Sequence, residues 1–342
     1  MEEPVLTLSI RALCLVSFVL SALTACGTRV HMRALEPSAV PRATTIKRLS
    51  VAKLNRDTLG VAEQLELSLA SVRIEGSPYF TVVSREDLAR VLSEQRLQSS
   101  GLIDSKKAVK IGELLGAQAI ISGAVGPAQA QKRVSAKERM ECTDPTCKTE
   151  KKVKVRCETL NVSLSLQLKL VDVRQGDIIY GHEDQLSRAW SACEGEGSTI
   201  PLPDVALRSL SRDLVDRFVQ KLSPRYVSYL VKVLTDPDVE LSQDALNRFK
   251  GGVEFLDAGR YERAQALFEE LGGGEGSGSV VVLYNLGLAL EAQGQLADAL
   301  RLYQRADQLT SSPVDEISDA LDRCKKRLYD LGEVNRQLKG DE

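Results

Sequence analysis

The chain has 342 residues, of which 43% are hydrophobic, 27% are charged and 4% are aromatic. This ordinary globular composition excludes a collagen-like, low-complexity or wholly disordered chain, and the length suffices for two compact domains. The 45 Lys and Arg against 47 Asp and Glu give a net charge of −2, so no positive excess points to nucleic acid. With His31 and His182 as the only two histidines, most metallohydrolases and Ser-His or Cys-His catalysis are disfavoured.

The N-terminal segment has the pattern of a targeting signal. Residues 12–25 carry no charge, and this stretch is too short to cross a bilayer core of about 30 Å as a helix. Its length is typical of the hydrophobic region of a secretory signal peptide. It ends in Leu23, Thr24 and Ala25, directly before Cys26. We therefore expect residues 1–25 to be a signal peptide that is removed.

This ending resembles the lipobox of bacterial lipoproteins. The resemblance implies that Cys26 carries acyl chains such as palmitate, which anchor a protein stably in a membrane. Because Gly27 rather than Asp follows, it also implies the outer membrane, with the protein facing the periplasm. The alternative is a cytosolic protein with an apolar N-terminal helix. The first eleven residues hold two Glu and one Arg where positive charge is expected, so translation starting at Val5 or Leu8 is a further alternative.

Residues 26–45 contain Pro37 and Pro41 among Ser, Thr and Ala. This composition predicts a lipidated, extended tether between the anchor and the first domain.

The cysteines indicate an oxidising compartment. Of the seven, Cys14 leaves with the signal peptide, and Cys324 lies in a helical pattern that predicts a buried free thiol. Four others, an even number that suits two disulfides, fall in one domain: Cys142, Cys147, Cys157 and Cys193. Three pairings are open, and proximity along the chain favours the first two together and the last two together. A zinc site is the alternative, but its ligand spacing fits poorly and no His is near, so we predict no metal.

Residues 46–234 alternate between strand and helix patterns, which indicates an α/β domain. The predicted strands cover 46–54, 79–83, 119–125 and 162–172, with a return strand from 177. The predicted helices cover 59–74, 84–95, 105–115 and 203–222, and the pattern at 225–234 fits a strand or a short helix. Within 162–172, four leucines alternate with polar residues, which predicts a half-buried strand with one wet face.

Three stretches of this domain suggest a family. They are FTVVSREDL at 80–88, VLSEQRL at 91–97 and GELLGAQAIISG at 112–123, and a Leu-rich strand and turn follow at 166–177. Over about residues 46–225 the chain resembles the periplasmic domain of CsgG-like curli secretion lipoproteins and of the LpoB-like activators. The resemblance implies an α/β sandwich with a mixed sheet. Its motifs are core and turn positions rather than a catalytic signature.

The inserts of this domain depart from the CsgG pattern. CsgG-like channels cross the outer membrane with two amphipathic hairpins per subunit, which need a lipid-facing apolar stripe. Residues 131–158, in the charged Cys-containing insert 131–160, hold nine Lys or Arg and five Asp or Glu and show no such stripe. The second insert, 186–203, is too short to span. We therefore predict no pore. The charged insert either docks on an anionic surface or is a solvated, disulfide-pinned hairpin.

Residues 241–338 contain an internal repeat with an offset of 35 residues. Gly252 corresponds to Gly287, and Phe268 to Tyr303, a small/large pattern that resembles tetratricopeptide (TPR) repeats. The resemblance implies an all-α array of helical hairpins with a peptide-binding concave face. The helix-packing positions expected in the second repeat are Leu283, Leu286, Gly287, Leu290, Ala299, Tyr303 and Ala306. A third helix over 315–337 is expected to cap the array.

No phosphate-binding, metalloprotease or hydrolase motif occurs in the sequence, so we predict no catalytic residue and no cofactor. The fold class expected is an N-terminal α/β sandwich followed by an all-α TPR array. The function expected is a non-enzymatic, lipid-anchored periplasmic scaffold that binds envelope proteins of secretion, assembly or peptidoglycan synthesis, with homo-oligomerisation left open. The alternatives are a subunit of a CsgG-type secretion channel and, further off, an enzyme or metal-binding protein.

Overall fold

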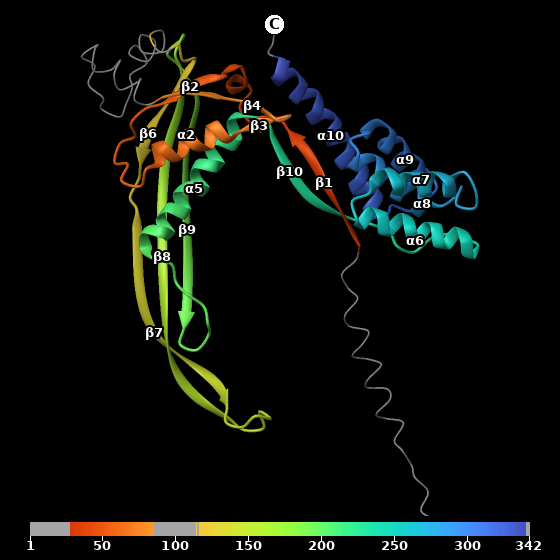
Figure 1. Cartoon of the computed structure of the whole chain (residues 1–342), viewed down its shortest axis with the longest axis horizontal. Coiled ribbons are helices and arrows are strands. Elements are labelled where there is room, and N and C mark those ends of the chain that lie inside the picture. The colour runs from red at the N-terminus through yellow and green to blue at the C-terminus, as the bar shows by residue number, and fades with distance from the viewer. Residues whose placement is uncertain (1–27, 85–113, 115, 340–342) are drawn as a thin grey trace, which may run out of the picture. The chain divides into compact units, whose positions relative to one another are not determined.

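The computed structural model describes residues 28–84, 114 and 116–339, and it divides into two compact units (Figure 1). One, here called the helical unit, combines the N-terminal residues up to Glu36 with Tyr226–Glu333. The other, here called the α/β unit, combines Pro37–Arg225 with the end of the chain from Val334. Each unit is described by itself below.

The α/β unit is built on one curled, mixed sheet (Figure 1). Its elements are η1 (Pro41–Thr45), β2 (Arg48–Val51), α2 (Val61–Ser71), β3 (Arg73–Ile74), β4 (Ser77–Pro78), β5 (Thr81–Val83), β6 (Ala119–Val125), β7 (Gln129–Cys142), β8 (Glu150–Asp172), β9 (Ile178–Cys193) and α5 (Pro203–Leu222). The sheet order is β5-β2-β6-β8-β7, and β9 also pairs with β8. Strand β2 is parallel to β5 and β6, whereas β8 is antiparallel to β6, β7 and β9. The mixed sheet with its helices confirms the predicted fold class of this domain.

The core of this unit lies between the sheet and helices α2 and α5. In β8 the even positions from Leu160 to Leu170 are buried, while the odd positions between them are polar, as the alternation predicts. Helix α5 buries one stripe against this face, from Ala206 through Leu214 to Leu222. The helix therefore covers the half of the sheet that the leucines line.

The strands around the charged insert are longer than predicted. Strand β8 has 23 residues, and its distal half pairs with β7 from Ser163 down to Glu150. Strand β9 pairs with β8 as far as Cys193, so residues 186–193 continue a strand rather than start a separate insert. The two predicted inserts therefore form one three-stranded extension of the sheet, because backbone pairing in a solvent-exposed ladder needs no apolar pattern.

The helical unit contains β1 (Arg29–Glu36), β10 (Arg225–Lys232), α6 (Gln243–Asp257), α7 (Tyr261–Gly272), α8 (Val280–Ala292), α9 (Leu296–Gln308) and α10 (Asp315–Lys339). The first residue of β10 and the last residues of α10 are assigned to the α/β unit. Helices α6 with α7 and α8 with α9 form consecutive pairs, whose buried aromatic residues make the centre of the core: Phe249, Phe268, Tyr284 and Tyr303. The helical C-terminal region is thus present as predicted.

The predicted tether over 26–45 is wrong for its central part. Residues Arg29–Glu36 form β1, which pairs with β10 in a two-stranded sheet, and η1 follows at Pro41–Thr45. The physical reason is the alternation of Val30, Met32 and Ala34, which are buried while their neighbours are exposed. Strand β10 also settles the choice between strand and helix at 225–234.

Several predictions fall outside the described residues. These include the signal peptide, the lipobox residues with Cys26, and nearly all of the helices expected over 84–95 and 105–115. Among the residues that the structure does describe, no helix combines the length and the apolar character needed to cross a membrane.

Candidate interaction surfaces

Two disulfides pin the three-stranded extension. Cys142 is bonded to Cys147 across the turn at the end of the β7–β8 hairpin. Cys157 of β8 is bonded to Cys193 of β9, and these two residues are directly opposite in the strand register. The structure therefore confirms the pairing that proximity along the chain favoured.

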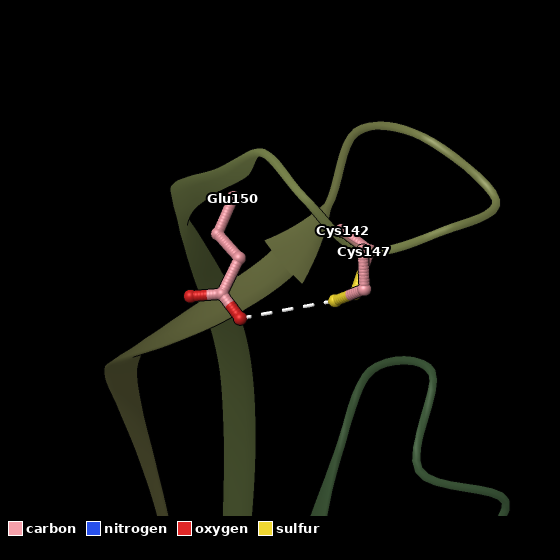
Figure 2. Close-up of side chains that lie close together, drawn as sticks. All are labelled: Cys142, Cys147 and Glu150. Carbon is pink, nitrogen blue, oxygen red and sulfur yellow. Dashed lines mark hydrogen bonds between the residues drawn. A yellow bond between two sulfur atoms is a disulfide. The ribbon is translucent and has the colours of Figure 1, made fainter. Parts of the chain in front are cut away.

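The hairpin end brings Cys142, Cys147 and Glu150 together (Figure 2), with potential ligand atoms within 4.8 Å of one another. One oxygen of Glu150 lies 3.8 Å from the sulfur of Cys147. Zinc binds cysteine as the thiolate. While the two sulfurs are bonded to each other they are not thiolates, so the arrangement does not favour the zinc alternative.

The turn itself is organised by Asp144. Its carboxylate accepts hydrogen bonds from the hydroxyls of Thr146 and Thr149, and from the backbone N–H groups of Thr146, Lys148 and Thr149. These bonds, those from the two threonine hydroxyls first, hold the pKa of Asp144 well below its usual range. Asp144 is therefore ionised at neutral pH, and its charge is committed to holding the turn.

Most cations of the hairpin are not neutralised by neighbours. Within it, Glu158 pairs with Lys132 at 2.5 Å and with Arg156 at 3.3 Å, and Arg139 pairs with Glu141 at 2.5 Å. In the described part of the chain, six exposed cations of the hairpin make no ion pair: Arg133, Lys137, Lys148, Lys151, Lys152 and Lys154. The hairpin therefore presents a cationic surface to solvent.

One face of the hairpin adds apolar groups to this charge. Side chains of a strand alternate between faces, so Val134 and Met140 share a face with Lys152 and Lys154 of the paired strand. Val134 and Met140 are 55% and 50% exposed. Beside them a pocket of about 540 Å³ lies between the hairpin and residues 198–203, with Arg156 in its lining. This face of the hairpin therefore combines exposed cations with exposed apolar side chains.

His182 lies in β9 opposite Leu168 and next to the core. Its ring stacks on that of Tyr180 at a centroid distance of 5.7 Å, and the Tyr180 hydroxyl lies 3.1 Å from Nδ1. Phe218 of α5 packs near both rings, with its centroid 5.7 Å from that of Tyr180 and 6.3 Å from that of His182. These are the contacts of a residue that packs across strand and helix.

In the helical unit, the two predicted repeats make the same close contact. A Cβ added at Gly252 would lie 2.6 Å from the ring of Phe268, and one at Gly287 would lie 2.5 Å from the ring of Tyr303. The seven packing positions predicted for the second repeat are all buried. Cys324 is buried and free as predicted, and burial raises the pKa of its thiol to about 11. It is therefore not a reactive thiolate at neutral pH.

The structure also contains an ionic cluster that sequence reasoning missed. Glu291 of α8 is fully buried and accepts hydrogen bonds from Tyr303 at 2.8 Å, Arg323 at 2.8 and 2.9 Å, and Arg327 at 3.0 Å. Burial opposes its ionisation, but the bonds and charges of Arg323, Tyr303 and Arg327 outweigh this and lower the pKa of Glu291. One signal was available: α8 is apolar on all sides, so an acid within it must be buried.

Comparison with known proteins bears on the α/β unit. Residues 68–191 match the family model described as "Curli production assembly/transport component CsgG". No curated protein matches the chain significantly. Among solved structures, the LpoB C-terminal domain from Salmonella enterica is 18% identical, with a TM-score of 0.26, 51% of this chain covered and 93% of that chain. The PelC dodecamer from Paraburkholderia phytofirmans is 11% identical, with a TM-score of 0.22, 58% of this chain covered and 99% of that chain.

The family match agrees with the mixed sheet and helices described above. It supports an envelope-associated role in protein interaction or transport, without specifying which. The chain therefore carries a CsgG-like α/β domain, followed by a helical C-terminal region.

Proposed function

We propose that this protein is a non-enzymatic, lipid-anchored scaffold at the periplasmic face of the outer membrane. It binds proteins of the secretion, envelope-assembly or peptidoglycan-synthesis machinery. The observation that carries the proposal is the pair of disulfides in a CsgG-like domain, because such bonds persist in an oxidising compartment and are rare in the cytosol. The lipobox-like ending at Cys26 supplies the anchor in this proposal.

The helical unit supports the scaffold role. Gly252 with Phe268, and Gly287 with Tyr303, repeat one small/large contact in two successive helix pairs, as a TPR array would. Such arrays bind peptides or helices on a concave face. The cationic and apolar face of the hairpin supplies a second surface for an envelope partner.

A secretion-channel subunit is the second candidate, because the family description names transport and the β7–β8–β9 strands are long. The charges of β7 speak against it. Lys132 and Glu138 lie on one face of this strand, and Arg133 and Lys137 lie on the other. Neither face offers the continuous apolar stripe that a lipid-facing strand needs.

Metabolic labelling tests the anchor. The full chain, expressed in a bacterial host with labelled palmitate, is expected to take up label and to sediment with the outer membrane. The Cys26→Ala variant should lose both the label and the membrane fraction. Equal labelling of the two proteins would contradict the proposal, and a heat-resistant ring in detergent would favour the channel instead.

A further inference from the structure

The strand nearest the proposed anchor is an integral part of the helical unit. Val30 and Met32 of β1 are at most 1% exposed, and they belong to the core that also contains Phe249 and Tyr284. Their neighbours His31 and Arg33 are exposed, so β1 has one face in the core and one in solvent. A tether that could lift away from the unit would not bury alternate side chains in this way.

Hydrogen bonds to the backbone of residues 28–33 come from three other parts of the unit. The N–H of Val233, directly after β10, donates to the carbonyl oxygen of Thr28 at 2.9 Å. The hydroxyl of Tyr261 in α7 donates to the carbonyl of His31 at 2.9 Å, and the guanidinium of Arg327 in α10 donates to the carbonyl of Arg33 at 3.1 Å. Order in the helical unit therefore extends to Thr28.

The covalent chain leaves little distance between Thr28 and the proposed acylation site. Gly27 is the only residue between Cys26 and Thr28. Consecutive Cα atoms are about 3.8 Å apart, so the Cα atoms of Cys26 and Thr28 are separated by at most about 8 Å. An acyl chain on Cys26 lies in the hydrocarbon region of the membrane, with the backbone of Cys26 at the headgroup level.

We propose that the helical unit docks on the membrane surface, through the end of the β1–β10 ribbon where Thr28 meets Val233. Its partner is the lipid leaflet that holds the acyl chains, and this proposal rests on the lipidation of Cys26. Arg29, Lys232 and Thr235 are exposed at this end, and Lys232 also pairs with Glu316 of α10 at 2.6 Å. The helical unit is consequently kept close to the membrane, within reach of membrane-bound partners.

The distance from the membrane can be measured by energy transfer. A dye is attached to the Thr235→Cys variant of the full-length lipidated protein in lipid nanodiscs that carry an acceptor on the headgroups. The native cysteines do not interfere. In the lipidated protein Cys14 has left with the signal peptide and Cys26 is acylated, while Cys324 is fully buried and the remaining four are disulfide-bonded. A Gly/Ser insert of 20 residues between Gly27 and Thr28 adds a coil with an r.m.s. span of about 25 Å. We expect efficient transfer in the parent protein and at least a twofold lower efficiency with the insert.

A matched variant carries the same insert in the exposed turn between Ser311 and Ser312, which leaves the connection to the anchor unchanged. Its transfer efficiency should equal that of the parent protein. Transfer in the palmitate-labelled parent protein as low as in the variant with the insert after Gly27 would overturn the docking but leave the lipid anchor standing. Absence of palmitate from the parent protein would overturn both, so the two failures are distinguishable.

Discussion

Glu291 shows how one buried charge fixes the position of a helix. Removing a carboxylate from water costs several kcal/mol unless its oxygens are satisfied. Here both oxygens accept hydrogen bonds from Arg323 of α10, and Arg327 adds another from the same helix. Because both arginines are one helical turn apart on α10, the charge specifies which face of α10 packs on α8. We infer that the cluster determines the register of the last helix.

Substitution of Glu291 by Gln should destabilise the helical unit by about 3–5 kcal/mol, because two arginines that are largely buried lose their counter-charge. Urea unfolding followed by circular dichroism measures this loss. Glu262→Gln is the matched control, since Glu262 is an exposed acid of α7. It should change the free energy of unfolding by about 0.5 kcal/mol or less. Equal effects of the two variants would show that the cluster contributes nothing.

The same residue predicts a pH dependence with a defined sign. The pKa of Glu291 is lower in the folded chain than in the unfolded chain. Its ionised form therefore stabilises the fold above the unfolded pKa of about 4.3, and this contribution is lost as the pH falls through the folded pKa. The difference in unfolding free energy between the parent and Glu291→Gln should be largest near pH 7 and shrink in acid. A difference that does not vary with pH would contradict the lowered pKa.

At the scale of elements, the helix pairs depend on two glycines. Gly287→Ala would place a methyl group 2.5 Å from the ring of Tyr303, and that ring is fully buried. Overpacking of this kind costs about 1–3 kcal/mol. Gly332→Ala in α10 is the matched control, because a Cβ there meets nothing within 4 Å. It should stabilise the helix by about 0.5–1 kcal/mol. In thermal unfolding we expect Gly287→Ala to lower the Tm and Gly332→Ala to raise it. A higher Tm for Gly287→Ala would refute the close packing.

The sequence predicts buried strands far better than exposed ones. Strand β6 was predicted with its observed bounds, because AIISGAV is an unbroken apolar run. The distal half of β8 was missed, because its apolar alternation is confined to Val153, Val155 and Cys157 and all the other residues from Glu150 to Glu158 are charged. In β1 the alternation of Val30, Met32 and Ala34 was present in the sequence, but Pro37 and Pro41 favoured a tether instead. Its partner β10 is about 200 residues away, so no local signal identifies the pairing.

The candidate sites also differ in how far the sequence predicts them. Proximity along the chain favoured the observed disulfide pairing without excluding the other two, and the strand register that places Cys157 opposite Cys193 came only from the structure. The cluster of Glu291 was not predictable, because its partners are 32 and 36 residues further along the chain. The cationic face of the hairpin also required the strand register, which sets Met140 opposite Lys152.

For the whole molecule, charge is unevenly distributed along the chain. The net charge is −2, yet residues 131–158 carry nine positive and five negative side chains, so the remainder is acidic. Interactions between exposed charges fade over a Debye length of about 10 Å at 0.1 M salt. The attraction between the hairpin and an anionic surface therefore depends on the cations of the hairpin rather than on the net charge of the protein. The protein should be retained by a negatively charged resin at pH 7 and low salt, despite its acidic balance.

Two double variants separate location from net charge. Lys152→Gln with Lys154→Gln removes two unpaired cations from the hairpin, and Lys250→Gln with Lys325→Gln removes two exposed cations from the helical unit. Both variants have the same net charge. We expect the hairpin double variant to elute at a lower salt concentration, with a shift at least twice that of the helical-unit double variant. The reason is that each cation in contact with the resin contributes to its salt-dependent retention. Equal shifts would mean that retention follows net charge, and that the hairpin is only a solvated part of the surface.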